Sequence, residues 1–199
     1  MRRFNTVCSI IYAVVAVVLL ALTIPAAAQT GGSRKLSNIK VENFGRISDT
    51  YYRGAQPRGH DYADLAGLGI KTVIDLTSDD GDANEKIMVE NAGMKYCRIP
   101  MTTHEPPSIA KLTEFLRIVN DPAGQPVFVH CVEGRHRTGV MTAVYRMTQY
   151  GWTADQAFQE MKKYKFGFDF LHPEFKKFIY DYYAQLVHKR TAPPLIPPS

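Results

Sequence analysis

A cysteine stands six positions before an arginine in residues 130–139, which read HCVEGRHRTG. The apolar run at residues 126–129, directly before the cysteine, is typical of a short buried strand, and residues 140–147 have apolar side chains at helical spacing. A loop between a strand and a helix directs its backbone N–H groups and the positive end of the helix at one point. The spacing therefore predicts a site that holds a phosphate group over a thiolate.

Each residue type in this loop has a chemical role. We expect Cys131 to be the nucleophile, because helix N-termini and nearby cations lower a cysteine pKa from about 8.5 to roughly 3.5–7.5 and the thiolate is the reactive form. Arg137 offers a planar fork of donors that binds two phosphate oxygens together. Gly134 permits positive φ. Thr138 is expected to donate a hydroxyl hydrogen bond to the Cys131 sulfur, and His130 to orient the loop from a buried position.

The backbone of the loop is predicted to bind the phosphate oxygens through Val132, Glu133, Gly134, Arg135 and His136, together with Arg137. Arg135 and His136 place additional positive charge in the loop. One interpretation is that this charge binds a substrate with several phosphates. The other is that it only adjusts the electrostatic potential of the loop and of Cys131. The chemistry is expected to need no metal and no cofactor.

The segment resembles the signature loop of the cysteine-dependent protein tyrosine phosphatases, and its Arg-Thr-Gly ending is similar to the dual-specificity branch. Residues 52–57 (YRGAQP), 69–76 (GIKTVIDL) and 145–152 (YRMTQYGW) resemble those of small atypical dual-specificity phosphatases of bacteria and fungi, among them the exported TpbA-type bacterial enzymes. The resemblance covers about residues 39–188. It implies a phosphatase fold and a phosphocysteine intermediate.

The resemblance also implies a proton donor for the leaving group, which in this family is an aspartate on a loop upstream of the cysteine. Here that loop is residues 101–108, and it contains no aspartate. Glu105 is its only carboxylate and is the predicted general acid, with His104 as the alternative acid. Alignment on His104 and the two prolines that follow Glu105 places Thr103 where a related lipid phosphatase carries its aspartate.

Other acidic residues precede this loop. Asp79, Asp80 and Asp82 follow the predicted strand at residues 72–76 and form another candidate for the acid, although the adjacent glycine favours a solvated turn. Asp75 lies within the apolar strand and is interpreted as structural.

The first residues have the pattern of a secretory signal: two arginines, an apolar segment at residues 7–24, and small residues up to a cleavage site after Ala28. The same segment is long enough to remain as a membrane anchor. Either outcome places the catalytic part outside the cytoplasm, in the periplasm or another extracytoplasmic compartment of a bacterium. Loss of the two arginines lowers the formal charge from +5 to +3, which gives no indication of nucleic-acid binding.

Only Cys97 and Cys131 remain after the predicted signal, so the chain has no disulfide framework. A bond between them would inactivate the enzyme reversibly, but Cys97 belongs to a strand expected at the sheet edge and is interpreted as a packing residue.

The 199 residues, 45% of them hydrophobic, predict one core without internal repeats. The predicted parts are a signal peptide or anchor (1–28), a linker (29–38), a catalytic domain (39–190) and a proline-rich tail (191–199). Strands are expected at 40–47, 50–53, 72–76, 95–100 and 126–129, and helices at 60–68, 84–91, 108–119, 137–150, 153–164 and 173–188. This alternation predicts an α/β fold with a mostly parallel sheet flanked by helices, in a monomer.

The predicted function is hydrolysis of phosphomonoesters on phosphorylated proteins, at phosphotyrosine and also phosphoserine or phosphothreonine. One alternative is an inositol-phosphate or phosphoinositide phosphatase that acts on a polyphosphorylated small molecule. Another is a phosphate-binding module without turnover. A rhodanese-like sulfur transferase also places a cysteine loop between a strand and a helix, but the Arg-Thr-Gly ending argues against it.

Overall fold

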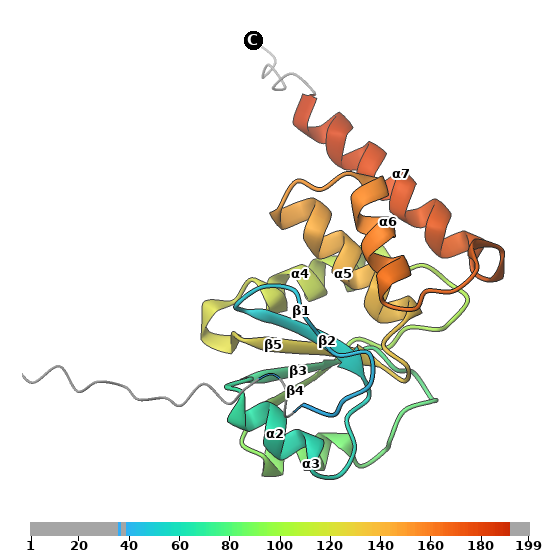
Figure 1. Ribbon diagram of the computed structural model, residues 1–199. Coiled ribbons are helices and arrows are strands. Elements are labelled where there is room, and N and C mark those ends of the chain that lie inside the picture. The colour runs from blue at the N-terminus through green and yellow to red at the C-terminus, as the bar shows by residue number, and fades with distance from the viewer. Residues whose placement is uncertain (1–35, 37–38, 192–199) are drawn as a thin grey trace, which may run out of the picture. The chain divides into compact units, whose positions relative to one another are not determined.

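A five-stranded sheet runs through the part of the chain that the computed structural model describes, residue 36 and residues 39–191 (Figure 1). Its strands are β1 (Gly45–Arg46), β2 (Tyr51–Ala55), β3 (Thr72–Asp75), β4 (Lys95–Arg98) and β5 (Val127–Cys131), in the order β1-β2-β5-β3-β4. Only the β1 and β2 pair is antiparallel among these neighbours. Parallel neighbours need crossover connections, and helices provide them here.

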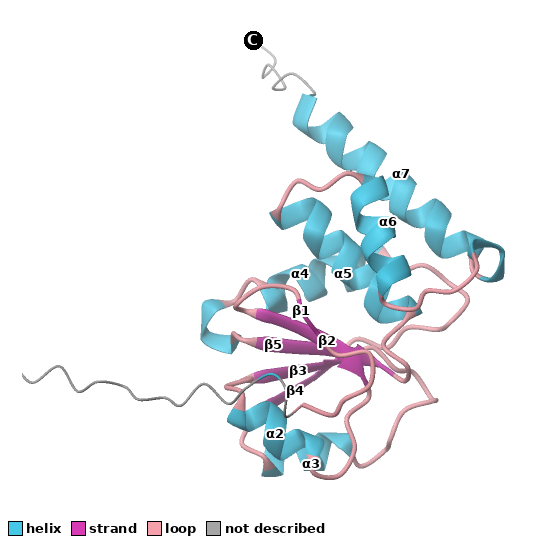
Figure 2. Cartoon of the chain, in the orientation of Figure 1, coloured by secondary structure: helices cyan, strands magenta, loops and turns pink. Residues whose placement is uncertain are grey.

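Helices cover both faces of this sheet (Figure 2). One face carries α2 (Asp61–Gly67) and α3 (Glu85–Asn91), and the other carries α4 (Ile109–Val119) and α5 (His136–Gln149). Two further helices, α6 (Ala154–Lys163) and α7 (Pro173–Thr191), pack against α5. Short 3-10 turns η2 (Pro122–Gly124) and η3 (Asp169–Leu171) precede β5 and α7.

Strand β5 is central in the sheet, between β2 and β3, and both of its faces are covered by packed side chains. Val127 and Val129 pack with Phe115 of α4 on one face, and Phe128 packs with the α2 and α3 side on the other. All five residues of β5 are buried. A strand buried on both faces reads as a continuous apolar run, which is how it is recognised in the sequence.

The helix boundaries follow local rules. The Ser108 side chain accepts a hydrogen bond from the backbone of Lys111 at the start of α4, and Thr153 forms a capping box with Gln156 at the start of α6. Gly69 and Gly93 follow α2 and α3 with φ of 96° and 81°, so both helices end at residues that adopt the left-handed region without strain.

The predicted fold class is confirmed, and most predicted elements lie where they are expected. The strand predicted at residues 40–47 is wrong in extent, since β1 is only Gly45–Arg46. Asn43 has a φ of 54°, and its side chain donates to the carbonyls of Gly134 and Tyr164. The chain before β1 is therefore held by contacts with Gly134 and Tyr164 and by one backbone hydrogen bond from Ala55 of β2 to Glu42, and the strand does not extend into it.

The predicted signal peptide lies outside the described residues, as do nearly all of the linker and the last residues of the tail. Within the described ranges, no helix combines the length and the apolar character required to cross a membrane.

Candidate active site

Cys131 is the last residue of β5, and its side chain is almost completely buried, with 3% exposed. Residues 132–135 form the loop, and α5 begins at His136. The loop walls a cavity of about 200 Å³, whose lining residues are Asp80, Thr103, Cys131, Val132, Glu133, Arg135, His136 and Arg137. The structure thus brings the predicted nucleophile, the predicted arginine and most of the predicted phosphate-binding loop to one cavity.

Gly134 holds the loop in a conformation that only glycine allows. Its φ is 65°, and a Cβ there would lie 2.3 Å from the carbonyl of Gly54 in β2. The Gly134 carbonyl accepts hydrogen bonds from Asn43 Nδ2, at 2.8 Å, and from the guanidinium of Arg53. The loop is therefore fixed against β2 and the chain before β1.

Arg53 supports the phosphate-binding loop although it does not line the cavity, and the sequence pattern did not indicate this contact. It is fully buried on β2, and its guanidinium lies over the Tyr164 ring, 4.1 Å from the centroid. Burial lowers the pKa of Arg53, while the charges of Tyr51, Tyr164 and Cys131 act in the opposite direction. The motif at residues 52–57 contained this arginine, but its contact with the loop depends on the pairing of β2 with β5.

Arg137 is paired with Asp80. Arg137 Nη1 donates to Asp80 Oδ1 at 2.9 Å and to the Met101 carbonyl at 3.2 Å, and Nη2 donates to Asp80 Oδ2 at 2.6 Å. The Arg137 hydrogen bond holds the pKa of Asp80 below its ordinary value. Burial by itself would lower the pKa of Arg137, but the hydrogen bond to Asp80 and the nearby Cys131 raise it. Asp80 is exposed, which fits its interpretation as part of a solvated turn, but it also lines the cavity, and its contact with Arg137 was not predicted.

His130 lies behind the loop, fully buried, with its Nε2 2.9 Å from Oε1 of the equally buried Glu85. The Tyr62 hydroxyl donates a hydrogen bond to Glu85 Oε1, and Gln56 donates one to Oε2. His130 is buried as predicted, and its orienting role remains a prediction. The Glu85 partner was not foreseen, because it comes from the first turn of α3, distant in sequence.

Asp75, Glu85 and His130 offer ligand atoms within 4.8 Å of one another, a grouping that could hold a metal ion. The oxygens of Asp75 already accept from the Thr77 backbone and from the Tyr96 hydroxyl, at 2.7 and 2.6 Å. With Glu85 also hydrogen-bonded, the cluster is a buried polar network that fits the structural role predicted for Asp75.

Glu105, the predicted general acid, lies outside the lining of the cavity. Glu105 is exposed and is not among the residues that line the cavity, while its backbone N–H donates to Thr102 Oγ1 at 3.2 Å. His104 is exposed too, and Thr103 is the residue of this loop that reaches the cavity. The roles of Glu105 and His104 remain predictions.

Thr138 is fully buried in the first turn of α5, and its hydroxyl finds no hydrogen-bond partner in the described part of the chain. The predicted bond to the Cys131 sulfur is not formed. The Thr138 carbonyl accepts from the Thr142 hydroxyl at 2.7 Å, which fixes the backbone of this turn but not the side chain. The catalytic role of Thr138 remains a prediction.

The extra positive charge of the loop is smaller than predicted. Arg135 Nη1 lies 3.5 Å from a carboxylate oxygen of Glu133. Burial, and then the neighbouring His172, lower the pKa of His136, whose ring centroid lies 3.9 Å from that of His172. His136 Nε2 is 3.0 Å from the Phe166 carbonyl. The loop therefore offers phosphate two arginines, and each of them also contacts a carboxylate: Arg137 contacts Asp80, and Arg135 contacts Glu133.

Both described cysteines are free. Cys97 lies half-buried on β4 at the sheet edge, and β3 separates it from Cys131 on β5. Two strand spacings are roughly 9–10 Å, beyond the Cα separation of about 7 Å that a disulfide tolerates. Burial raises the pKa of Cys97. The interpretation of Cys97 as a packing residue therefore fits the structure.

Comparison with known proteins agrees with this geometry. Residues 37–177 match the family described as "DSP-PTPase phosphatase fused to NAD+ Kinase". The chain belongs to this phosphatase family. A probable tyrosine-protein phosphatase of Dictyostelium discoideum, DG1060, is 30% identical over 61% of the chain and 75% of its own length. The dual specificity protein phosphatase TpbA of Pseudomonas aeruginosa is 30% identical over 63% of the chain and 56% of its own length.

The inositol diphosphatase SIW14 of Saccharomyces cerevisiae is 29% identical over 64% of the chain. The chain spans about half the length of TpbA and SIW14. Among solved structures, P. aeruginosa TpbA aligns with a TM-score of 0.61 at 26% identity, over 73% of this chain and 91% of that one. A TpbA variant in complex with phosphotyrosine aligns with a TM-score of 0.58 at 26% identity, over 71% and 90%. The predicted membership of the cysteine-dependent phosphatases is confirmed.

Proposed function

We propose that this protein hydrolyses phosphomonoesters on phosphorylated proteins through a phosphocysteine intermediate. The observation that carries the proposal is the shared cavity of Cys131 and Arg137 at the junction of β5 and α5. A buried cysteine at the end of a strand, a helix N-terminus and a guanidinium fork together fit a phosphoryl group in transfer. Family membership supports the same chemistry.

Two steps complete the reaction. The Cys131 sulfur attacks phosphorus and forms a P–S bond, while the P–O bond to the leaving group breaks and Glu105 gives a proton to the departing oxygen. A water molecule then attacks phosphorus and loses a proton to the Glu105 carboxylate. The P–S bond breaks, inorganic phosphate departs, and the Cys131 thiolate is restored. In this proposal Arg137 and the loop N–H groups bind the phosphoryl oxygens in both steps.

Hydrolysis of an aryl phosphate by the reduced protein tests the proposal. The unmodified chain is expected to turn over 4-nitrophenyl phosphate, and Cys131→Ser to lose this activity while it keeps the fold and affinity for inorganic phosphate. Absence of turnover in the unmodified, reduced protein would reject the enzyme and favour a phosphate-binding module.

The charge of the cavity favours a substrate with a single phosphate, such as phosphotyrosine, over a polyphosphorylated one. Glu133 and Asp80 each pair with an arginine of the cavity, so little net positive charge remains for a substrate with many phosphates. The relative named as an inositol diphosphatase keeps the alternative open. Assays with a phosphotyrosine peptide and an inositol pyrophosphate separate the two, and a preference of tenfold or more for the inositol compound would reverse the assignment.

We further propose that the chain is exported in a bacterium by its N-terminal segment and acts as a monomer outside the cytoplasm. The pattern of residues 1–28 supports export. Fractionation of cells that express the full chain, followed by N-terminal sequencing, tests both cleavage after Ala28 and anchoring. Recovery of the uncut chain in the cytoplasm would contradict export.

A further inference from the structure

The hydrogen bonds of Arg137 leave only one edge of its guanidinium available. A guanidinium has five N–H groups. Nη1 donates to Asp80 and to the Met101 carbonyl, and Nη2 donates once to Asp80. Nε is buried and has no acceptor among the described residues. The remaining donors, Nε–H and the second Nη2–H, lie side by side on the edge that does not contact Asp80. Two parallel donors on one edge match two oxygens of a phosphoryl group.

Asp80 is itself held in place. Its Oδ1 accepts from the Ser78 backbone N–H at 3.2 Å. At Gly81 a Cβ would lie 2.2 Å from the Thr77 hydroxyl, so this turn packs too tightly for a larger residue. The Arg137 side chain is 4% exposed and the Asp80 side chain 39% exposed, so the pair spans the inner and outer parts of the cavity.

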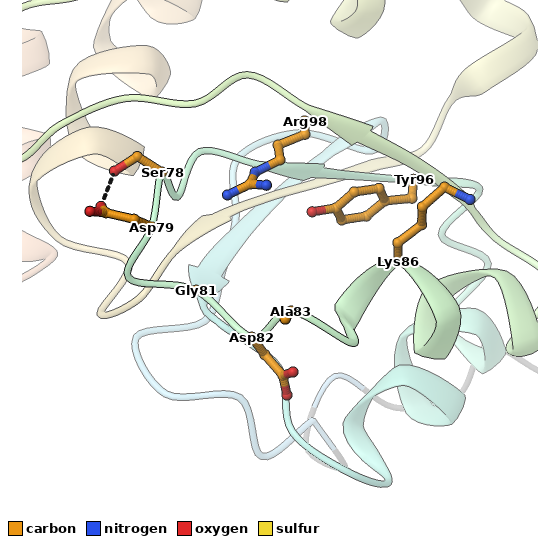
Figure 3. Close-up of a pocket in the computed structure, with 8 residues that line it drawn as sticks. All are labelled: Ser78, Asp79, Gly81, Asp82, Ala83, Lys86, Tyr96 and Arg98. Carbon is orange, nitrogen blue, oxygen red and sulfur yellow. Dashed lines mark hydrogen bonds between the residues drawn. The ribbon is translucent and has the colours of Figure 1, made fainter.

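The neighbouring aspartate is directed elsewhere. Asp79 accepts a hydrogen bond from the Ser78 hydroxyl and lines a separate pocket with Lys86 of α3 and Tyr96 and Arg98 of β4 (Figure 3). Asp79 and Asp80 are adjacent carboxylates of one turn, but only Asp80 contacts Arg137. Asp79 provides a matched control.

We propose that Asp80 is a positioning residue, which binds the Nη1/Nη2 edge of Arg137 so that the Nε/Nη2 edge faces the phosphoryl group. The inference rests on the proposed phosphatase function of the same cavity. Asp80 acts through Arg137 and does not exchange a proton with the substrate. Its negative charge repels a phosphate dianion, so its benefit to the reaction is the orientation of Arg137 and not the attraction of substrate.

Kinetics of Asp80→Asn test this role, with Asp79→Asn as the control. Loss of orientation is expected to lower kcat by about tenfold or more, while KM changes by less than about threefold because relief of repulsion offsets the weaker hydrogen bonds. The loss is expected to be equal for 4-nitrophenyl and phenyl phosphate, since a positioning residue does not depend on the leaving group. Asp79→Asn is expected to stay within about twofold of the unmodified protein.

Other results would overturn the proposal. A rise in kcat/KM in Asp80→Asn would show that Asp80 inhibits the enzyme by occupying Arg137. A loss of activity confined to phenyl phosphate would show that Asp80 is the proton donor. If Asp79→Asn lost as much activity as Asp80→Asn, the loss would be explained by damage to the turn and not by the contact with Arg137. In the double variant, Arg137→Lys is expected to cost at least fivefold less when Asp80 is already asparagine, and independent, multiplicative losses would contradict the proposed coupling.

A measurement without turnover separates this inference from the proposed function. Nitrogen NMR of the full chain, with Arg137 assigned by its loss in Arg137→Lys, is expected to show slow guanidinium rotation that Asp80→Asn makes fast. If the unmodified protein hydrolyses none of the substrates but Asp80→Asn still makes the Arg137 guanidinium rotate faster, the proposed phosphatase function is rejected and the contact between Asp80 and Arg137 is supported. Active protein with unchanged rotation in Asp80→Asn would leave the function and remove the role of Asp80.

Discussion

The phosphate-binding loop and the loop at residues 101–108 both border the cavity, but they are held very differently. Gly134 accepts hydrogen bonds from Asn43 and Arg53, and a Cβ at its position would collide with the backbone of Gly54. In the second loop Met101 and Pro107 are buried, whereas His104 and Glu105 are exposed. The phosphate-binding loop is therefore fixed by contacts with the core, whereas the loop at residues 101–108 exposes to solvent the two side chains that are predicted to be proton donors.

This difference has a chemical reason. Phosphoryl oxygens must meet several donors at once, and such donors are effective only when the fold fixes them before the substrate arrives. A proton donor needs a single contact with the leaving group, and a loop that is exposed at its tip can supply it after the substrate has entered. Substitutions in the first loop should therefore be costly for every substrate, and those in the second should depend on the leaving group.

Arg137→Lys should have the largest effect. Lysine cannot bind two phosphoryl oxygens with a planar fork, so kcat/KM for 4-nitrophenyl phosphate is expected to fall by about 10²–10³-fold. Arg117→Lys, at an exposed position of α4, is the control and should change the rate by less than about twofold. Activity of Arg137→Lys near that of the control would show that the first loop does not bind the reacting phosphate.

Glu105→Gln should remove the proton donor. We expect kcat to fall by about 10²-fold with phenyl phosphate and by less than about tenfold with 4-nitrophenyl phosphate, whose phenoxide leaves without protonation. Glu114→Gln, at an exposed site on α4, should leave both rates unchanged. Equal rates of Glu105→Gln and the unmodified protein on phenyl phosphate would remove Glu105 from the mechanism, and the same pair of substrates then tests His104.

Gly134→Ala should damage the first loop through its backbone. A Cβ at this positive φ would lie 2.3 Å from the Gly54 carbonyl, so the free energy of unfolding should fall by about 2–3 kcal/mol, and kcat/KM by about tenfold. Gly69 also has a positive φ, but a Cβ there would meet no other atom. Gly69→Ala should therefore lower the free energy of unfolding by about 1 kcal/mol without loss of activity. Denaturant unfolding and aryl phosphate turnover measure both, and equal outcomes for the two variants would contradict a specific contact with Gly54.

His136 should produce the smallest effect, in the pH dependence of stability. Its pKa is lowered in the folded protein by burial and by His172, so the unfolded chain binds a proton at higher pH than the folded one. Stability should therefore fall as the pH decreases from about 6.5 through the lowered pKa. Between pH 7.5 and 5.5 the unmodified protein should lose about 2 °C more in Tm than His136→Gln. His188→Gln, at an exposed site, is the control, and a loss in His136→Gln equal to that of the unmodified protein would contradict the assignment.

The sequence was sufficient to predict the parts of the site that are contiguous in the chain. Residues 126–139 carry their strand, their loop and their helix in one stretch, and local patterns predict all three. The fold class followed from the same alternation of strands and helices. These features depend on neighbours within a few residues, which a single sequence displays directly.

Contacts between distant segments were not predictable in this way. Asp80 meets Arg137, Arg53 meets Gly134, and Glu85 meets His130 only because β2, β3 and β5 are adjacent in the sheet. The turn at residues 79–82 has the composition of a solvated turn, and nothing local marks Asp80 as different from Asp79. Strand order places this turn beside the phosphate-binding loop, and the conformation of the turn then decides which aspartate faces the cavity.

Direct capture of the intermediate tests the central claim. Reduced protein is mixed with 4-nitrophenyl phosphate, quenched in acid within the first turnover, digested, and the peptide that contains Cys131 is weighed by mass spectrometry. We expect this peptide to carry one phosphoryl group on sulfur, and Cys131→Ser to carry none. Sustained turnover without any phosphorylated Cys131 peptide would contradict the account.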